Sequence, residues 1–217
     1  MNLFGKNTDH EVAIIAEIGV NHEGDPDAAL KLLRMAAEAG ADAVKFQTYT
    51  PARYASASDP ERLIRVGQFA LDEKAHQALA REAEQLDVSV FSTPLSEDVV
   101  PLLDELFPAF KIASGDLTFE PVIRAALGTG KPVILSTGLG EMAEIEQAIA
   151  WARDEVGDAV LRDRLLLMHC VSAYPTPIDQ ANVLSVPFVA EKTGLRVGYS
   201  NHVIGPDACL AAVALGA

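Results

Sequence analysis

Basic residues are scarce in this chain, and the shortage restricts its binding partners. Its 17 Lys and Arg residues stand against 31 Asp and Glu residues, which gives a formal net charge of −14 at pH 7. A nucleic-acid-binding protein needs a cationic face to neutralise phosphates, and no run of Lys or Arg is present. We therefore expect no nucleic-acid partner, and an anionic substrate has to be held by a few placed cations.

Cysteine is also scarce, and long apolar runs are missing. Cys170 and Cys209 lie in apolar stretches outside any CxxC pair, which argues against a disulfide scaffold or a structural zinc site. The polar segment Met1–His10 lacks the hydrophobic region of a secretory signal. No apolar stretch reaches the roughly 18 residues of a membrane span. These absences predict a cytoplasmic protein without a membrane partner.

What the chain does contain is a strict alternation of β-branched apolar runs with Ala- and Leu-rich stretches of helical period. The predicted strands are Val12–Gly19, Ala43–Thr48, Ser89–Thr93, Ala109–Ala113, Pro132–Ser136, Leu165–Val171 and Arg196–Ser200. The predicted helices are Pro26–Ala39, Pro60–Gln68, Asp72–Leu86, Glu97–Leu106, Glu120–Leu127, Glu141–Val156, Asn182–Glu191 and Pro206–Leu215.

Seven β-α units in this order predict an α/β fold with a parallel sheet. Six of the seven strands end in polar or glycine-bearing loops suited to one shared mouth, which favours a TIM-type (β/α)8 barrel over an open sheet. We expect residues 1–217 to form a single barrel domain that lacks its eighth strand, as a fragment or with a neighbouring chain completing it. The exposed edges of an open barrel favour a homodimer.

Two lysines lie where apolar core residues are expected. Lys45 and Gln47 share one face of the second strand, and Lys111 lies inside the fourth strand, with Ser114 just beyond its end. One buried lysine could extend its ammonium to the rim. Two such lysines instead indicate a shared anion, and a small ligand with a phosphate and a carboxylate would serve.

Other polar residues join the lysines at the strand ends. Glu17 on the first strand could simply pair with a lysine, or it could act as a base or hold a substrate hydroxyl. Three further strands end in hydroxyls, which can cap the following helices or form a phosphate-binding rim. These hydroxyl-bearing ends are Ser92-Thr93, Ser136-Thr137 and Ser200.

The histidines and Cys170 give weaker signals. His202 follows the seventh strand and could ligate a metal, although a hydrogen-bonded loop histidine is the plainer interpretation. His22 and His169 are similar single residues, and we expect Cys170 to belong to the core.

Taken in order, these motifs resemble the N-acetylneuraminate synthase family. The resemblance spans Val12 to Ala217, and no single motif would establish it. It rests on Ile14-Ile15-Ala16-Glu17-Ile18-Gly19-Val20-Asn21-His22-Glu23-Gly24, Val44-Lys45-Phe46-Gln47-Thr48, Phe91-Ser92-Thr93-Pro94, Lys111-Ile112-Ala113-Ser114-Gly115-Asp116-Leu117-Thr118, Ile134-Leu135-Ser136-Thr137-Gly138, His169-Cys170, Tyr174-Pro175-Thr176-Pro177 and Gly198-Tyr199-Ser200-Asn201-His202.

This resemblance implies a transferase of sialic acid biosynthesis that condenses phosphoenolpyruvate with N-acetylmannosamine or a related amino sugar and releases phosphate. A divalent metal, usually Mn²⁺ with Mg²⁺ or Co²⁺ as alternatives, would polarise the aldehyde. The resemblance implies that Lys45, Lys111, Thr93 and Ser114 would hold the phosphate of phosphoenolpyruvate. It implies that Ser136 and Ser200 would hold its carboxylate side. Glu17 would act near the water or a sugar hydroxyl. Gln47 and Tyr174 would line the sugar pocket, and His202 would be one metal ligand.

The chain also departs from the family pattern. The second metal histidine belongs to the eighth strand and, like the antifreeze-like C-terminal domain, lies outside this sequence. Ser172 replaces an Asn of bacterial sialic acid synthases, and the loop Tyr49–Leu71 lacks a sugar-contacting Asn. The sugar therefore stays open between N-acetylmannosamine and a diacetamido sugar. Two alternatives remain: a non-catalytic barrel fragment that binds an anion or a partner chain, and a phosphoenolpyruvate-condensing barrel that acts on a sugar phosphate.

Overall fold

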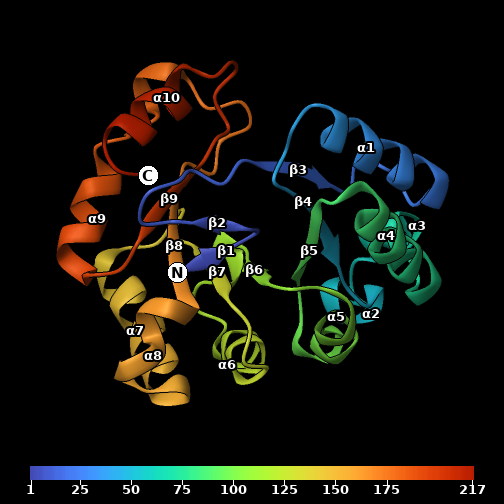
Figure 1. Cartoon of the computed structure of the whole chain (residues 1–217). Helices are drawn as coiled ribbons and strands as arrows, with labels where there is room; N and C mark the ends of the chain where they lie inside the picture. Colours follow the sequence, from blue (N-terminus) through green and yellow to red (C-terminus); the bar gives the residue numbers. More distant parts are fainter. The chain divides into compact units, whose positions relative to one another are not determined.

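The computed structural model describes residues 1–217, which group into two compact units. One unit is Asn2–Phe110, and the other is Lys111–Ala217 together with Met1. Both are α/β structures in which strands alternate with helices, as the sequence predicts (Figure 1). The single barrel domain stays a prediction.

The first unit contains a parallel sheet whose strands follow the order of the chain. A short N-terminal hairpin precedes this sheet, and the helices lie beside its strands (Figure 1). Its strands are β1 (Asn2–Leu3), β2 (Lys6–Asn7), β3 (Ile15–Gly19), β4 (Ala43–Thr48) and β5 (Ser89–Pro94), followed by the first residue of β6 (Phe110–Ile112). Its helices are α1 (Pro26–Glu38), α2 (Pro51–Tyr54), α3 (Pro60–Phe69), α4 (Glu73–Leu86) and α5 (Val100–Leu106).

The second unit repeats the same design. Strands β7, β8 and β9 pair in parallel, and helices α8, α9 and α10 pack against them. Its strands after β6 are β7 (Val133–Ser136), β8 (Leu165–Cys170) and β9 (Val197–Ser200). Its helices are α6 (Glu120–Gly128), α7 (Met142–Val156), α8 (Asp158–Arg164), α9 (Ser185–Thr193) and α10 (Asp207–Ala214).

Local sequence explains where the main helices begin. Asp25 caps α1 by accepting a hydrogen bond from the Asp27 amide, and Pro26 occupies the first turn, where its missing N–H costs nothing. Asp72 caps α4 in the same way through the Ala75 amide. Both helices begin within one residue of the predicted start, and the cap of α1 ends the loop that follows β3.

Each unit buries its own apolar core. Phe46 and Phe91 are fully buried in the first unit, where Phe4 of the hairpin packs against Phe91 with ring centroids 4.7 Å apart. Leu135 and Leu165 have the same role in the second unit. None of the helices combines the length and the apolar character that crossing a membrane requires.

The structure differs from the predicted elements in three respects. The first predicted strand begins at Ile15 instead of Val12, because Ile14 donates its amide to the Asp42 carboxylate at 2.8 Å instead of to a strand. Helices α2 and α8 and the hairpin β1–β2 were not predicted. Gly19 leaves the strand alternation, since a bulge after Glu17 pairs Gly19 with Phe46.

Candidate active site

In the first unit, β3, β4 and β5 bring three of the predicted site residues together. Lys45 is 7% exposed, and its ammonium donates to Thr93 Oγ1 at 2.8 Å. Glu17 Oε2 lies 2.9 Å from the same ammonium. The strand register places Glu17 directly beside Lys45, so this ion pair follows from the sheet itself. The buried cation therefore has a carboxylate and a hydroxyl as fixed partners.

The bulge at Gly19 places the Glu17 carboxylate. Gly19 has a φ of +57°, a left-handed conformation that glycine adopts without steric cost. A Cβ atom at this position would lie 3.0 Å from Glu17 Oε1. Gln47 is half-buried, and its Nε2 would lie 3.6 Å from the same Cβ. The glycine thus leaves space for both polar side chains.

The second unit holds a similar pair of a lysine and a hydroxyl. Lys111 is 7% exposed and donates to the Ser136 hydroxyl through a short hydrogen bond and to the Ile112 carbonyl at 3.0 Å. Ser136 is the last residue of β7 and is also buried. The structure therefore places the Ser136 hydroxyl in contact with a lysine that is predicted to hold phosphate.

Ser114 lies in a cluster that the sequence only partly predicted. Its Oγ accepts from the Gly138 amide at 3.1 Å and lies 3.1 Å from Cys170 Sγ. Gly138 leaves the space for this cluster, since a Cβ there would lie 2.7 Å from Cys170 Sγ, 2.8 Å from Ser114 Oγ and 2.9 Å from Ser172 Oγ. Cys170 is buried, which confirms the prediction that it belongs to the core, and its thiol also contacts a predicted site residue.

A cavity of about 310 Å³ adjoins the same cluster in the second unit. Cys170 and Ser172 line it, together with Thr137 from the loop after β7. Phe188 of α9 contributes an apolar wall.

Asp116 is a functional candidate that sequence reasoning missed. It ends the turn Ser114–Asp116 directly after β6. Burial raises the pKa of its carboxyl group to about 6, although the positive charge of Lys111 acts in the opposite direction. A carboxyl group that titrates near neutral pH can exchange protons with a substrate. The sequence feature that could have identified Asp116 is its position in the same motif as Lys111 and Ser114.

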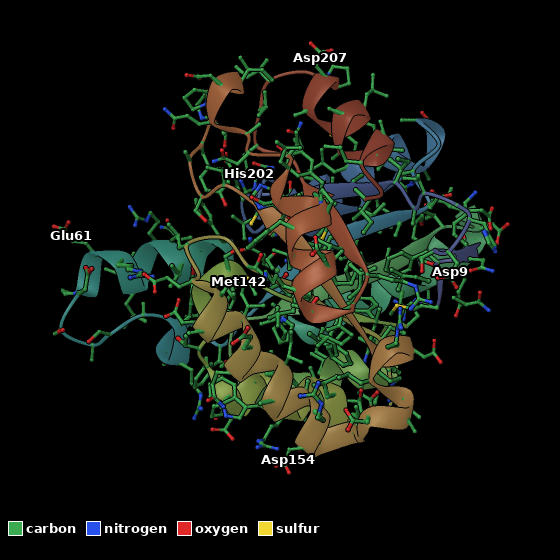
Figure 2. The ribbon with its side chains drawn as sticks, turned by 90° about the vertical axis from the view of Figure 1, so that its left-hand side faces the viewer. Asp9, Glu61, Met142, Asp154, His202 and Asp207 are labelled. Atoms are coloured by element: carbon green, nitrogen blue, oxygen red, sulfur yellow. The ribbon has the colours of Figure 1, made fainter.

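His202 lies in the loop between β9 and α10, toward the end of the unit that carries the start of α7 at Met142 and away from Asp154 (Figure 2). Its Nδ1 is 2.5 Å from the Val171 carbonyl. A carbonyl only accepts, so Nδ1 carries the proton, and in the neutral ring the lone pair is on Nε2. Metal-ligating histidines show this arrangement.

The residues predicted to bind the metal and the sugar make fewer contacts with one another than the residues predicted to hold the anion. No group of three or more His, Cys, Asp or Glu side chains in residues 1–217 could hold a metal ion, so His202 fits the role of one ligand only. Tyr174 is 77% exposed, and its ring centroid lies 4.2 Å from that of His202. Ser200 pairs with Cys170 in the β8–β9 register. His169 Nε2 donates to the Ala181 carbonyl oxygen at 3.0 Å, which holds the ring in place.

The NeuB family model matches residues 32–217, and this range includes both lysine–hydroxyl pairs. The chain belongs to the NeuB family. The resemblance seen in the sequence is therefore confirmed.

Two curated relatives show the range of products in this family. The chain is 38% identical to the N,N'-diacetyllegionaminic acid synthase of Campylobacter jejuni, over 94% of this chain and 64% of that protein. It is 36% identical to the pseudaminic acid synthase of Helicobacter pylori, over 94% of this chain and 63% of that protein. The chain thus spans less than two thirds of the length of either synthase.

A solved structure supports the same relationship. The N-acetylneuraminic acid synthetase of Leptospira borgpetersenii, in complex with citrate, superposes with a TM-score of 0.89 at 32% identity. The match covers 96% of this chain and 71% of that chain. The NeuB fold therefore extends over nearly all of the residues described above.

Proposed function

We propose that the protein condenses phosphoenolpyruvate with an N-acetylated amino sugar to give a nonulosonic acid and phosphate. The observation that carries this proposal is the pair of buried lysines, each hydrogen-bonded to a hydroxyl: Lys45 to Thr93 and Lys111 to Ser136. Buried ammonium groups are costly unless anionic partners compensate them. Glu17 already supplies one such partner to Lys45 at 2.9 Å, and a substrate with a phosphate and a carboxylate would supply further anionic partners to both lysines.

In the proposed reaction, carbon 3 of phosphoenolpyruvate adds to the sugar aldehyde, water adds to carbon 2, and phosphate leaves. Lys45, Lys111, Thr93 and Ser114 would hold the phosphate, and Ser136 and Ser200 the carboxylate side. Glu17 would take a proton from the water or orient a sugar hydroxyl. Gln47 and Tyr174 would contact the sugar.

His202 would provide one ligand for a divalent metal, with Mn²⁺ as the leading candidate and Mg²⁺ or Co²⁺ as alternatives. Such an ion supplies Lewis acidity to a carbonyl when it is bound. The hydrogen bond from Nδ1 to Val171 supports Nε2 as the ligating atom. We also propose that the seven β-α units form part of a TIM-type barrel, that the protein is a homodimer, and that it is cytoplasmic, where its two free cysteines stay reduced.

Phosphate release tests the proposed reaction. The chain would be incubated with phosphoenolpyruvate, Mn²⁺ and either N-acetylmannosamine or a diacetamido sugar, and release would be followed against reactions that lack the sugar. We expect sugar-dependent release with one of these acceptors. Calorimetric binding of phosphoenolpyruvate without any turnover would instead support a non-catalytic, anion-binding protein, and the absence of both would contradict the proposal.

A further inference from the structure

Three buried polar side chains form a hydrogen-bonded chain in the first unit. Thr48 at the end of β4 and Ser92 on β5 have hydroxyl oxygens 2.7 Å apart, and Nε2 of His76 from α4 lies 2.7 Å from Thr48 Oγ1. Thr48, Ser92 and His76 are 4%, 0% and 1% exposed. The proposed reaction uses none of them, so their hydrogen bonds call for another explanation.

One carbonyl group fixes the direction of the whole chain. His76 Nδ1 lies 2.8 Å from the Asp72 carbonyl oxygen, which can only accept, so Nδ1 carries the proton. In the neutral ring Nε2 must then accept from the Thr48 hydroxyl. The Thr48 oxygen is left to accept from the Ser92 hydroxyl. Burial lowers the pKa of His76 and favours this neutral form.

The chain lies behind the residues that hold the anion. Side chains alternate along a strand, so Thr48 and Ser92 point to the helix side and Lys45 and Thr93 to the opposite side. Ser92 directly precedes Thr93 in β5, and Thr48 follows Lys45 by three residues in β4. Fixing the two hydroxyls from behind therefore fixes the two strand segments that carry the lysine and its partner.

Helix α4 gives this arrangement a rigid support. Asp72, the residue directly before α4, caps the helix through the Ala75 amide at 2.8 Å and accepts from His76 through its carbonyl. The ring of His76 also packs near Phe107, with centroids 6.2 Å apart. These contacts hold the imidazole in one orientation, and its hydrogen-bonded chain in turn restrains both strands.

We propose that the chain of His76, Thr48 and Ser92 is a positioning device that sets the separation between Lys45 Nζ and Thr93 Oγ1 for an anionic substrate oxygen. This inference rests on the proposed role of Lys45 and Thr93 in binding phosphoenolpyruvate. The three residues are positioning residues, since none faces the substrate side of the sheet.

A matched pair of substitutions tests the device. Thr48→Val removes the hydroxyl and keeps the side-chain shape, whereas Thr48→Ser keeps the hydroxyl. We expect Thr48→Val to weaken the affinities for phosphoenolpyruvate and inorganic phosphate about tenfold, because small displacements of positioning groups have effects of this order or larger. Thr48→Ser should retain the parent affinities, and calorimetry measures both.

Val90→Ala is the control for a purely structural effect. Val90 is 3% exposed and lies on the same face of β5, two residues before Ser92, without taking part in the hydrogen bonds. This variant should lose stability and keep its affinity. Equal affinities for Thr48→Val and the parent, or an equal loss in Val90→Ala, would overturn the inference.

A second measurement does not depend on the proposed function. In spectra of the ¹⁵N-lysine-labelled chain, the Lys45 ammonium signal should shift in Thr48→Val and stay in place in Thr48→Ser. If the parent chain fails to bind phosphoenolpyruvate, the proposed function fails, and this signal still decides the inference. An unmoved Lys45 signal in Thr48→Val would then reject it.

Discussion

At the scale of single residues, the structure gives each buried lysine a defined neighbourhood. Lys45 and Lys111 are both 7% exposed, and each donates to a hydroxyl. Lys45 also pairs with the Glu17 carboxylate at 2.9 Å, and Lys111 also donates to the Ile112 carbonyl at 3.0 Å, so an incoming anion would bind beside partners that already stabilise each ammonium. This arrangement suits a ligand that must bind and then leave.

The first prediction removes one of these charges. Lys111→Met keeps the length of the side chain and should weaken phosphoenolpyruvate binding roughly 10- to 100-fold, because a hydrogen bond to a charged group contributes about 1.5–3 kcal/mol. Titration calorimetry measures the change. Lys74→Met is the control, since Lys74 is exposed on α4, and this variant should bind like the parent. Unchanged affinity in Lys111→Met would contradict the role given to Lys111.

The position of both lysines inside predicted apolar strands predicted their burial, because both faces of such a strand are covered. The same reasoning could not find the contact of Cys170 with Ser114, since 56 residues separate them in the chain. It also missed His76, whose helical position gives no sign that its ring reaches Thr48. Contacts that depend on how helices pack on strands are invisible to local patterns.

At the scale of elements, the predicted and observed bounds agree most closely where a capping residue begins a helix or where the apolar pattern is regular. Strand β4 and the starts of α1 and α4 were predicted to within one residue. Helix α8 was missed because it follows α7 after only Gly157, whose φ of +80° ends the first helix. The hairpin β1–β2 was missed because its strands have two residues each and its turn uses Phe4 and Gly5, both with positive φ.

The second prediction concerns the bulge in β3. Gly19→Ala should cost about 1–2 kcal/mol of unfolding free energy, because a non-glycine residue is strained in the left-handed region. The new Cβ would also approach Glu17 Oε1 at 3.0 Å and displace the carboxylate from Lys45. Urea denaturation measures the loss.

Gly67→Ala provides the comparison for this variant. Gly67 lies inside α3, and no atom lies within 4 Å of a Cβ at that position. This substitution should raise stability by about 0.5–1 kcal/mol, since glycine is unfavourable within a helix. Gly19→Ala as stable as the parent would show that the bulge tolerates a side chain.

At the scale of the whole molecule, two buried histidines make stability depend on pH. Burial lowers the pKa of both His22 and His76 from the ordinary value of 6.5. The folded state therefore favours the neutral rings. Their contribution is complete above about pH 6.5 and is lost as the pH falls below this value, because the unfolded chain takes up protons more readily. Asp116, with its raised pKa, acts in the opposite sense between about pH 6 and 3.8.

The third prediction isolates His76 from these other groups. His76→Gln cannot titrate, so its unfolding free energy should fall less between pH 7.5 and 5.5 than that of the parent chain. Comparing the two proteins cancels the contributions of Asp116 and of the overall charge of −14. Urea unfolding at each pH gives the values. Parallel pH profiles would show that the ring of His76 is not held neutral.

The buried chain of His76, Thr48 and Ser92 also has an evolutionary consequence. Losing one member leaves an orphaned donor or acceptor away from water, whereas exchanging all three for apolar residues of similar shape removes the polar requirement altogether. We therefore expect the residues at these three positions to be substituted together among relatives. Lineages that have abandoned the hydrogen bonds would be recognisable by apolar residues at all three places, and their lysine on β4 would need support from elsewhere.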